Sequence, residues 1–442
     1  MAGGRIPSTG VRSSRPLELV MVGAGNRGHL SYGAYALRYP EQVRFVAVAE
    51  PDEGRRHRFA DAHGIPPERQ FRGWEELAER PRMGVGLVNA TMDPTHRSSA
   101  VALLECGYHM LLEKPMATSP RECVEIVGAA EQHGRMLQIG HVLRYSAFFR
   151  AIREAVSSGR LGPIVSVDWR ENLVYWHYAH SFVRGNWANS GRTGPLILTK
   201  CCHDLDLLTW MFGPCEQVAS AGSLRHFTPA AMPAPAPDRC TDGCPIADEC
   251  PYYAPRVYLE RYRENPNGFT TNALTLDRTP EGIMRALTTG PYGRCVYRCD
   301  NDVVDHQVVL MVFLDGLSVS LTMQGGSHVE GRTARIDGRR ATLLANEARW
   351  EIEIVDHLTG AREPVNVPRP TLGGHSGGDE GIMRAFVAGL RGDTSGVVTS
   401  ARESLESHLL AFAAEQARVE GAVVGMADYR RAVAQQSLAG AA

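Results

Sequence analysis

No run of apolar residues in the 442-residue sequence reaches the roughly 18 residues that a membrane-spanning helix needs. The first sixteen residues, MAGGRIPSTGVRSSRP, also lack the apolar core of a secretory signal and the adjacent arginines of a twin-arginine signal. We therefore expect residues 1–16 to form a flexible tail. We also expect a cytoplasmic protein, whose ten cysteines would be mostly reduced.

The sequence has little net charge, a formal −2, and no internal repeat. This balance excludes a protein that grips nucleic acid through a basic face, and 43% hydrophobic against 22% charged residues excludes a disordered chain. The length suits two domains. The expected partners are therefore a small molecule and further copies of the chain, not nucleic acid or a membrane.

Apolar runs alternate with amphipathic stretches through residues 17–140. The expected strands are LELVMVG, VRFVAVAE, VGLVNAT, HMLLEK and RMLQIG, with helices between them, including residues 55–63 and 98–105. Nearly continuous apolar strands are typical of a parallel sheet covered on both faces. The pattern predicts an α/β fold that begins with a doubly wound Rossmann domain.

The pattern changes in residues 141–442. A helix is expected at 146–157, a strand at IVSVDWREN, hairpin turns at Asp315-Gly316 and Asp337-Gly338, and two closing helices between 378 and 424. These elements predict an α+β domain with an open, mostly antiparallel sheet. A proline-rich loop opens a cysteine-containing insert at about 228–300.

A glycine motif follows the first strand. In VMVGAGNRGHL the spacing G-x-G-x-x-G sets Gly23 at a tight turn, Gly25 against a pyrophosphate and Gly28 against the sheet, at a helix N-terminus that favours phosphate. The next strand ends in Glu50, a carboxylate suited to the adenosine ribose. We therefore expect NAD rather than NADP, although the nearby Arg55 and Arg56 are suited to a 2′-phosphate; the alternative is a purely structural glycine turn.

The stretch ATMDPTHRSSAVALLECGYHMLLEKPMA ends a strand in Glu113-Lys114-Pro115, and the proline restricts Lys114 to an extended backbone. With the glycine motif, the Thr-x-x-x-x-His loop from Thr91 to His96 and a later His-x-x-Asp segment, the chain resembles the Gfo/Idh/MocA oxidoreductase family from about residue 17 to 424. The resemblance implies that Lys114 lies beside the nicotinamide and contacts the reacting hydroxyl, and that Glu113 contacts the nicotinamide ribose. It also implies a homodimer or homotetramer. The candidate cofactor-binding residues are Gly23, Gly25, Asn26, Arg27, Gly28, Glu50, Thr91, Pro94, His96, Glu113 and Lys114.

The segment GPLILTKCCHDLDLLTWMFG has apolar residues at helical spacing. The family usually has Asp four residues before His203, whereas this chain has Thr199. Lys200 is a charge at the head of an otherwise apolar helix, so we expect Lys114, His203 and Lys200 to handle protons, with Asp206 or Asp204 orienting the imidazole. The neighbouring Cys201 and Cys202 are expected to be packing residues.

Arg144-Tyr145 and the run NLVYWHYAHSFVRGNW, residues 172–187, are rich in aromatic, His and Arg side chains, which are suited to binding a polyol. Rings stack on the apolar face of a sugar while polar groups bond its hydroxyls. Packing or dimer contact is the alternative for each, and His177 with His180 is a weaker metal candidate. The candidate substrate residues are Arg144, Tyr145, His180, Arg184, Trp187 and Asp206.

The insert contains DRCTDGCPIADECP and GRCVYRC. A loop with little apolar content needs a source of order, which four thiolates on zinc would supply, with Cys295 favoured over Cys299 as fourth ligand. An iron–sulfur cluster, free thiols or disulfides remain alternatives. The predicted ligands are Cys240, Cys244, Cys250 and Cys295.

Three functions follow from these features. The first is an NAD(H)-dependent oxidoreductase that transfers hydride between nicotinamide and a hydroxyl or keto group of a sugar or polyol. The second is a redox-neutral NAD-dependent glycosidase, acting by oxidation, elimination, hydration and reduction, for which Lys200 would be the additional base. The third is a sensor of NAD or of a sugar that has lost catalysis.

Overall fold

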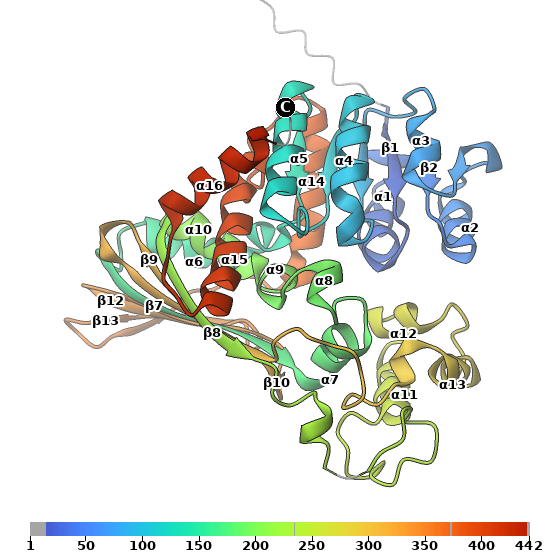
Figure 1. Ribbon diagram of the computed structural model, residues 1–442. Helices are drawn as coiled ribbons and strands as arrows, with labels where there is room; N and C mark the ends of the chain where they lie inside the picture. Colours follow the sequence, from blue (N-terminus) through green and yellow to red (C-terminus); the bar gives the residue numbers. More distant parts are fainter. Residues whose placement is uncertain (1–14, 234, 372–373, 440–442) are drawn as a thin grey trace, which may run out of the picture.

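The computed structural model describes residues 15–233, 235–371 and 374–439, which form two sheets with helices packed against them (Figure 1). Most of the predicted tail therefore lies outside the described residues. The first sheet is parallel, with the strand order β3-β2-β1-β4-β5-β6. Its strands are β1 (Leu17–Val22), β2 (Val43–Ala49), β3 (Gln70–Phe71), β4 (Gly86–Asn89), β5 (His109–Leu112) and β6 (Leu137–Ile139).

The five strands expected from the apolar runs are confirmed, and only the two-residue β3 has no counterpart among them. The chain reverses its direction of travel across the sheet between β1 and β4, which places a crevice at the carboxyl ends of these strands. The doubly wound prediction is thus correct. The helices of this part are the π-helix η1 (Asn26–Gly33), which continues as α1 (Ala34–Arg38), then α2 (Glu53–His63), α3 (Trp74–Ala78), α4 (His96–Glu105) and α5 (Pro120–Gln132).

The second sheet has nine strands in the order β14-β13-β12-β11-β7-β10-β9-β8-β15. Only β7 and β10 run parallel, and the other neighbours are antiparallel, as predicted. The turn expected at Asp315-Gly316 joins β9 to β10, whereas Asp337-Gly338 end β11 and the turn to β12 follows at residues 339–340. The bounds are β7 (Ile164–Val174), β8 (Cys215–Ser223), β9 (His306–Phe313), β10 (Ser318–Ser327), β11 (Gly331–Gly338), β12 (Ala341–Asn346), β13 (Glu351–Asp356), β14 (Arg362–Pro364) and β15 (Val424–Gly425).

Helices cover one face of this sheet (Figure 1). The long apolar helix expected around His203 is divided into α9 and α10, with Lys200 and Cys201 between them. Among its described residues, the insert between β8 and β9 contains three α-helices, α11 to α13. The helices are α6 (Ala147–Ser157), α7 (Tyr175–Tyr178), η5 (Ala179–Arg184), α8 (Ser190–Thr193), α9 (Leu196–Thr199), α10 (Cys202–Phe212), α11 (Ala254–Glu264), α12 (Phe269–Leu274), α13 (Pro280–Thr289), α14 (Gly378–Leu390), α15 (Ala401–Glu420) and α16 (Met426–Ala439).

The two closing helices expected between 378 and 424 are α14 and α15. Helix α14 returns to the first sheet, where Ile382 and Phe386 pack in one core with Leu19 and Met21 of β1. It therefore brings residues from the end of the chain to the crevice. Within the described ranges, no helix combines the length and the apolar character needed to cross a bilayer.

Candidate active site

The glycine loop after β1 has the geometry that its spacing predicts. Gly23 has a φ of +87°, and a Cβ there would lie 2.5 Å from the Ala90 carbonyl oxygen. A Cβ on Gly28 would lie 2.0 Å from the Gly23 carbonyl oxygen, whereas a Cβ on Gly25 would meet nothing within 4 Å. The loop is thus tight where it packs on the sheet and open where a pyrophosphate would approach the N-terminus of η1, so these residues fit a dinucleotide.

Replacing Gly23 by Ala should weaken dinucleotide binding by at least about tenfold, because the new Cβ would displace the loop and a loss of about 1.4 kcal/mol is tenfold in affinity. The dissociation constant of NAD+, measured by calorimetry, checks this. Gly128→Ala is the matched control, because a Cβ there meets nothing within 4 Å in the middle of α5. Unchanged affinity in Gly23→Ala would exclude this loop as the phosphate site.

Glu50 lies at the end of β2, where its buried carboxylate accepts hydrogen bonds from the backbone N–H of Ala24 (2.7 Å) and of Asp52 (3.0 Å). It is therefore fixed against the glycine loop. The guanidinium of Arg56 donates to the Glu50 carbonyl oxygen at 2.7 Å, so this arginine bonds the strand end itself.

The loop after β4 is tied to the Glu-Lys-Pro strand end by His96. Its Nδ1 lies 2.7 Å from the Pro115 carbonyl oxygen and its Nε2 lies 3.1 Å from that of Thr91. Between them, the buried Asp93 accepts a hydrogen bond from Trp187 Nε1 at 2.7 Å. The predicted Thr-x-x-x-x-His loop thus lies directly beside Lys114.

Glu113 belongs to a network that the sequence does not reveal. One carboxylate oxygen accepts from Arg27 Nε and from the Tyr32 hydroxyl, both at 2.5 Å. Arg27 also pairs with Asp379 of α14 at 2.9 Å, and its charge holds the pKa of that carboxyl well below the usual range. The predicted cofactor residues Arg27 and Glu113 are therefore bonded to one another at the mouth of the crevice.

Lys114 follows β5, and its peptide bond to Pro115 is cis. Its Nζ donates to the Thr199 carbonyl oxygen at 2.9 Å. Thr199, which stands where the family usually has Asp, thus contributes its backbone. The contact joins the Rossmann domain to the segment between α9 and α10.

His203 is buried in the first turn of α10, and its Nδ1 has no hydrogen-bond partner among the described residues. Burial, and next the positive charge of Lys114, lower its pKa well below the ordinary value, so the imidazole is neutral. A neutral ring with an unused nitrogen can accept a hydrogen bond or a proton from a hydroxyl group placed beside it.

The expectation that Asp204 or Asp206 orients His203 is wrong. Asp206 accepts two hydrogen bonds of 2.7 Å from Arg144. Asp204 accepts from Trp169 Nε1 at 2.8 Å and also pairs with Arg332. Both carboxylates are thus committed to other partners.

Lys200 is also placed differently from the prediction. Its Nζ lies 3.0 Å from Glu171 of β7 and 3.4 Å from Glu330. Although burial lowers it, these carboxylates raise the pKa of Lys200 above its ordinary value. The ammonium therefore stays protonated, and Lys200 is unsuited to act as a base.

The candidate substrate residues have partners within the protein. Besides the buried ion pair of Arg144 with Asp206, the Tyr145 hydroxyl bonds Gln138 at 2.8 Å and His180 stacks on Tyr292. Arg184 is 2% exposed and donates to the carbonyls of Tyr252 and Arg294. Of the predicted set, Trp187 is the residue bonded to the loop beside Lys114.

The prediction of a zinc site in the insert finds no support. All ten cysteines are free, and among the described residues no group of three or more His, Cys, Asp or Glu is arranged to hold a metal ion. The insert has another source of order, because α11–α13 enclose a small core of their own. This core contains the predicted ligand Cys240 with Ala254, Tyr258, Ile283 and Leu287, whereas Cys244, Cys250 and Cys295 pack on the main core.

Tyr32, Asp379 and Glu171 belong to the site but were not predicted. Lys114 and Lys200, which were predicted, are the only two lysines of the chain, against 45 arginines. A second signal in the sequence points to Glu171. Glu171 occupies an inward position of β7, in line with Val167 and Trp169, where a carboxylate breaks the apolar alternation. Rare residue types and charges in buried positions thus mark the site.

The fold and the crevice define an NAD-binding oxidoreductase. Residues 17–141 match the model described as "Oxidoreductase family, NAD-binding Rossmann fold", and residues 153–426 match "Oxidoreductase family, C-terminal alpha/beta domain". The chain belongs to the Gfo/Idh/MocA family of oxidoreductases.

Individual proteins and solved structures of known name are also similar to this chain. The chain is 24% identical over 337 residues to YteT of Bacillus subtilis, which covers 73% of this chain and 76% of that protein. It is 28% identical over 214 residues to an inositol 2-dehydrogenase of Ralstonia nicotianae, with 48% and 59% covered. A levoglucosan dehydrogenase, solved with NADH and levoglucosan, shares the fold with a TM-score of 0.67 at 16% identity, with 93% of this chain and 100% of that chain covered.

Proposed function

We propose that this oxidoreductase is a dehydrogenase that transfers hydride between NAD(H) and a hydroxyl or keto group of a sugar, polyol or sugar derivative. The observation that carries the proposal is the hydrogen bond from Lys114, at the carboxyl edge of the first sheet, to the Thr199 carbonyl oxygen, four residues before the neutral His203 and beside the loop that fits a dinucleotide. Sugar and polyol dehydrogenases among the relatives support this substrate class. The fixed carboxylate of Glu50 supports NAD over NADP.

The dinucleotide, when bound, supplies the ring that exchanges hydride with the substrate carbon. Lys114 donates a hydrogen bond to the reacting oxygen and fixes its position, as it does here to the Thr199 carbonyl. The neutral His203 accepts the proton of the hydroxyl group in oxidation and returns it in reduction. Lys200 remains charged and forms ion pairs with Glu171 and Glu330, which fixes their positions.

The glycosidase alternative depends on Lys200 as an additional base, and its two ion pairs remove that support. One experiment separates the two reactions. Purified protein is incubated with NAD+ and a panel of sugars, polyols and aryl glycosides, while NADH absorbance and aglycone release are recorded together. Accumulation of NADH is expected, whereas aglycone release without net NADH would replace the dehydrogenase by the glycosidase.

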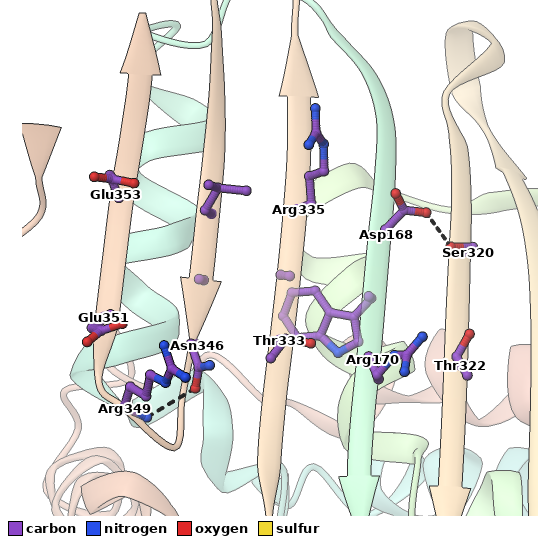
Figure 2. A pocket seen from close by; sticks show the side chains of 14 residues that line it. Asp168, Arg170, Ser320, Thr322, Thr333, Arg335, Asn346, Arg349, Glu351 and Glu353 are labelled. Carbon is purple, nitrogen blue, oxygen red and sulfur yellow. Dashed lines mark hydrogen bonds between the residues drawn. The ribbon is translucent and has the colours of Figure 1, made fainter. Parts of the chain in front are cut away.

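We also propose that the chain forms a homodimer or homotetramer through the uncovered face of the second sheet. Figure 2 shows side chains on this face, among them Glu351 and Glu353 of β13, Arg335 of β11, and Asp168 and Arg170 of β7. They line a shallow hollow of about 630 Å³. Charges of both signs on one flat patch suit a two-fold contact with a second copy. Leu310 is 57% exposed on β9 and lies opposite Ser320 of the hollow.

Leu310→Arg is expected to release monomers, because it sets a charge in the apolar part of this face. Light scattering on a sizing column measures the mass, with Leu37→Arg on the exposed surface of α1 as the control. A wild-type protein that elutes as a monomer would refute the proposal.

A cytoplasmic location is proposed as well, because all ten cysteines are free thiols.

A further inference from the structure

The insert lies against the two loops that face a dinucleotide. Asn26 Nδ2, in the glycine motif, donates to the Phe269 carbonyl oxygen of α12 at 3.1 Å. Further along, a Cβ on Gly54 at the start of α2 would lie 2.9 Å from the side chain of Leu276. Figure 1 shows α12 and α13 opposite the lower ends of α1 and α2. Residues 269–278 thus span the crevice edge from the phosphate loop to the ribose loop.

Two arginines meet at this contact, one from each side. Arg58 of α2 donates to Asn272 Oδ1 at 3.1 Å, and Arg278 donates to the same oxygen at 2.6 Å. Neither guanidinium forms an ion pair within the described residues. Arg58 Nε is buried without a hydrogen-bond partner, as is the neighbouring His29 Nδ1.

The electrostatics of the pair are unfavourable as they stand. Burial, then the charges of Arg278 and Arg55, lower the pKa of Arg58. Asp52 and Glu50 oppose this from the end of β2, but the Glu50 oxygens are bonded to backbone N–H groups and Asp52 caps α2. The two guanidinium groups share one neutral oxygen and keep N–H donors that are not used. An anion bound between them would stabilise this arrangement.

We propose that Arg58 and Arg278 form a phosphate site shared by the Rossmann domain and the insert, which binds a phosphate group of the dinucleotide. The proposal rests on the proposed function. It makes the insert part of the cofactor site, because Arg278 belongs to the loop that joins α12 to α13. The phosphate is either the pyrophosphate or the 2′-phosphate of NADP, which have the same charge chemistry.

Calorimetry with NAD+, NADP+ and adenosine on the full chain tests the proposal in Arg58→Gln and Arg278→Gln. Each variant should weaken dinucleotide binding by at least about tenfold, with adenosine unaffected. Equal weakening of NAD+ and NADP+ identifies the pyrophosphate, and weakening of NADP+ alone identifies the 2′-phosphate. Arg263→Gln, on the exposed surface of α11, is the control.

Arg278 also donates to Asn267 within the insert, so its variant is interpreted only with an unchanged unfolding temperature. The Arg58→Gln variant tests the same site without this complication, because the Arg58 guanidinium bonds only Asn272 among the described residues. Unchanged dinucleotide affinity in Arg58→Gln, or an equal loss for adenosine, would overturn the phosphate site. A wild-type protein that binds neither dinucleotide would instead refute the proposed function.

Discussion

Lys114→Ala is expected to lower kcat by about 100-fold or more with the substrate that the panel identifies. The variant removes the donor that lies at the carboxyl end of β5 and contacts the Thr199 carbonyl oxygen beside His203. Because the side chain acts on the reacting oxygen, affinity for the dinucleotide should change by only a few-fold. Steady-state kinetics and NAD+ calorimetry on the same preparation separate these two effects.

A kcat within about tenfold of the wild type would remove Lys114 from the reaction. The composition of the chain supplies a second, independent readout, because Lys114 and Lys200 are the only lysines. Lys200 is held by Glu171 and Glu330, so an amine reagent should modify Lys114 first. Bound NAD+ should protect it, as peptide mass spectrometry would show. Lys114→Arg, which keeps the charge but changes its shape, is the conservative control.

The first domain was predictable from local patterns. Strands buried on both faces read as apolar runs, and the glycine spacing fixes the turn at Gly23 and the close packing of Gly28 within a few residues. The proline after Lys114 is also a local signal, which predicts an extended backbone there, whereas the role of the lysine is what the family resemblance implies. Where the residues that determine a local structure lie within one strand and one turn, the sequence is sufficient to predict that structure.

The partners of the site residues were not predictable in this way. The apolar helix predicts that Lys200 carries protons, but its partner Glu171 lies on a strand 29 residues earlier and Glu330 lies 130 residues later. Asp379 reaches Arg27 only because α14 folds back onto the first sheet. Likewise, the low apolar content of the insert predicts that a metal site is needed to order it, whereas its three helices enclose a core of their own. These contacts depend on the packing of segments that are far apart in the sequence, and the hydrophobic periodicity within one segment does not predict them.

Arg332→Met is expected to lower the free energy of unfolding by about 3–5 kcal/mol, the usual loss when one partner of a buried ion pair is removed. Arg332 of β11 lies 2.9 Å from Glu171, 2.8 Å from Asp204 and 3.4 Å from Glu347, and its side chain is 9% exposed. Without it, two buried carboxylates lose their main counter-charge. Urea unfolding of the variant and the wild type measures the difference.

The pH dependence shows whether the loss is electrostatic. Burial raises the pKa of Glu171 from 4.5 to about 7, so its contribution to stability is present below pH 4.5 and is lost as the pH rises through about 7. Removing Arg332 favours the protonated acid further, and the deficit of the variant should therefore be smaller at pH 5.5 than at pH 8. Arg402→Met is the control, because Arg402 lies on the exposed surface of α15, away from the proposed oligomer contact, in an exposed pair with Glu131, and such a pair contributes about 0–1 kcal/mol. Equal losses for the two variants, or a deficit that does not depend on pH, would show that the network around Glu171 is held by packing rather than by charge.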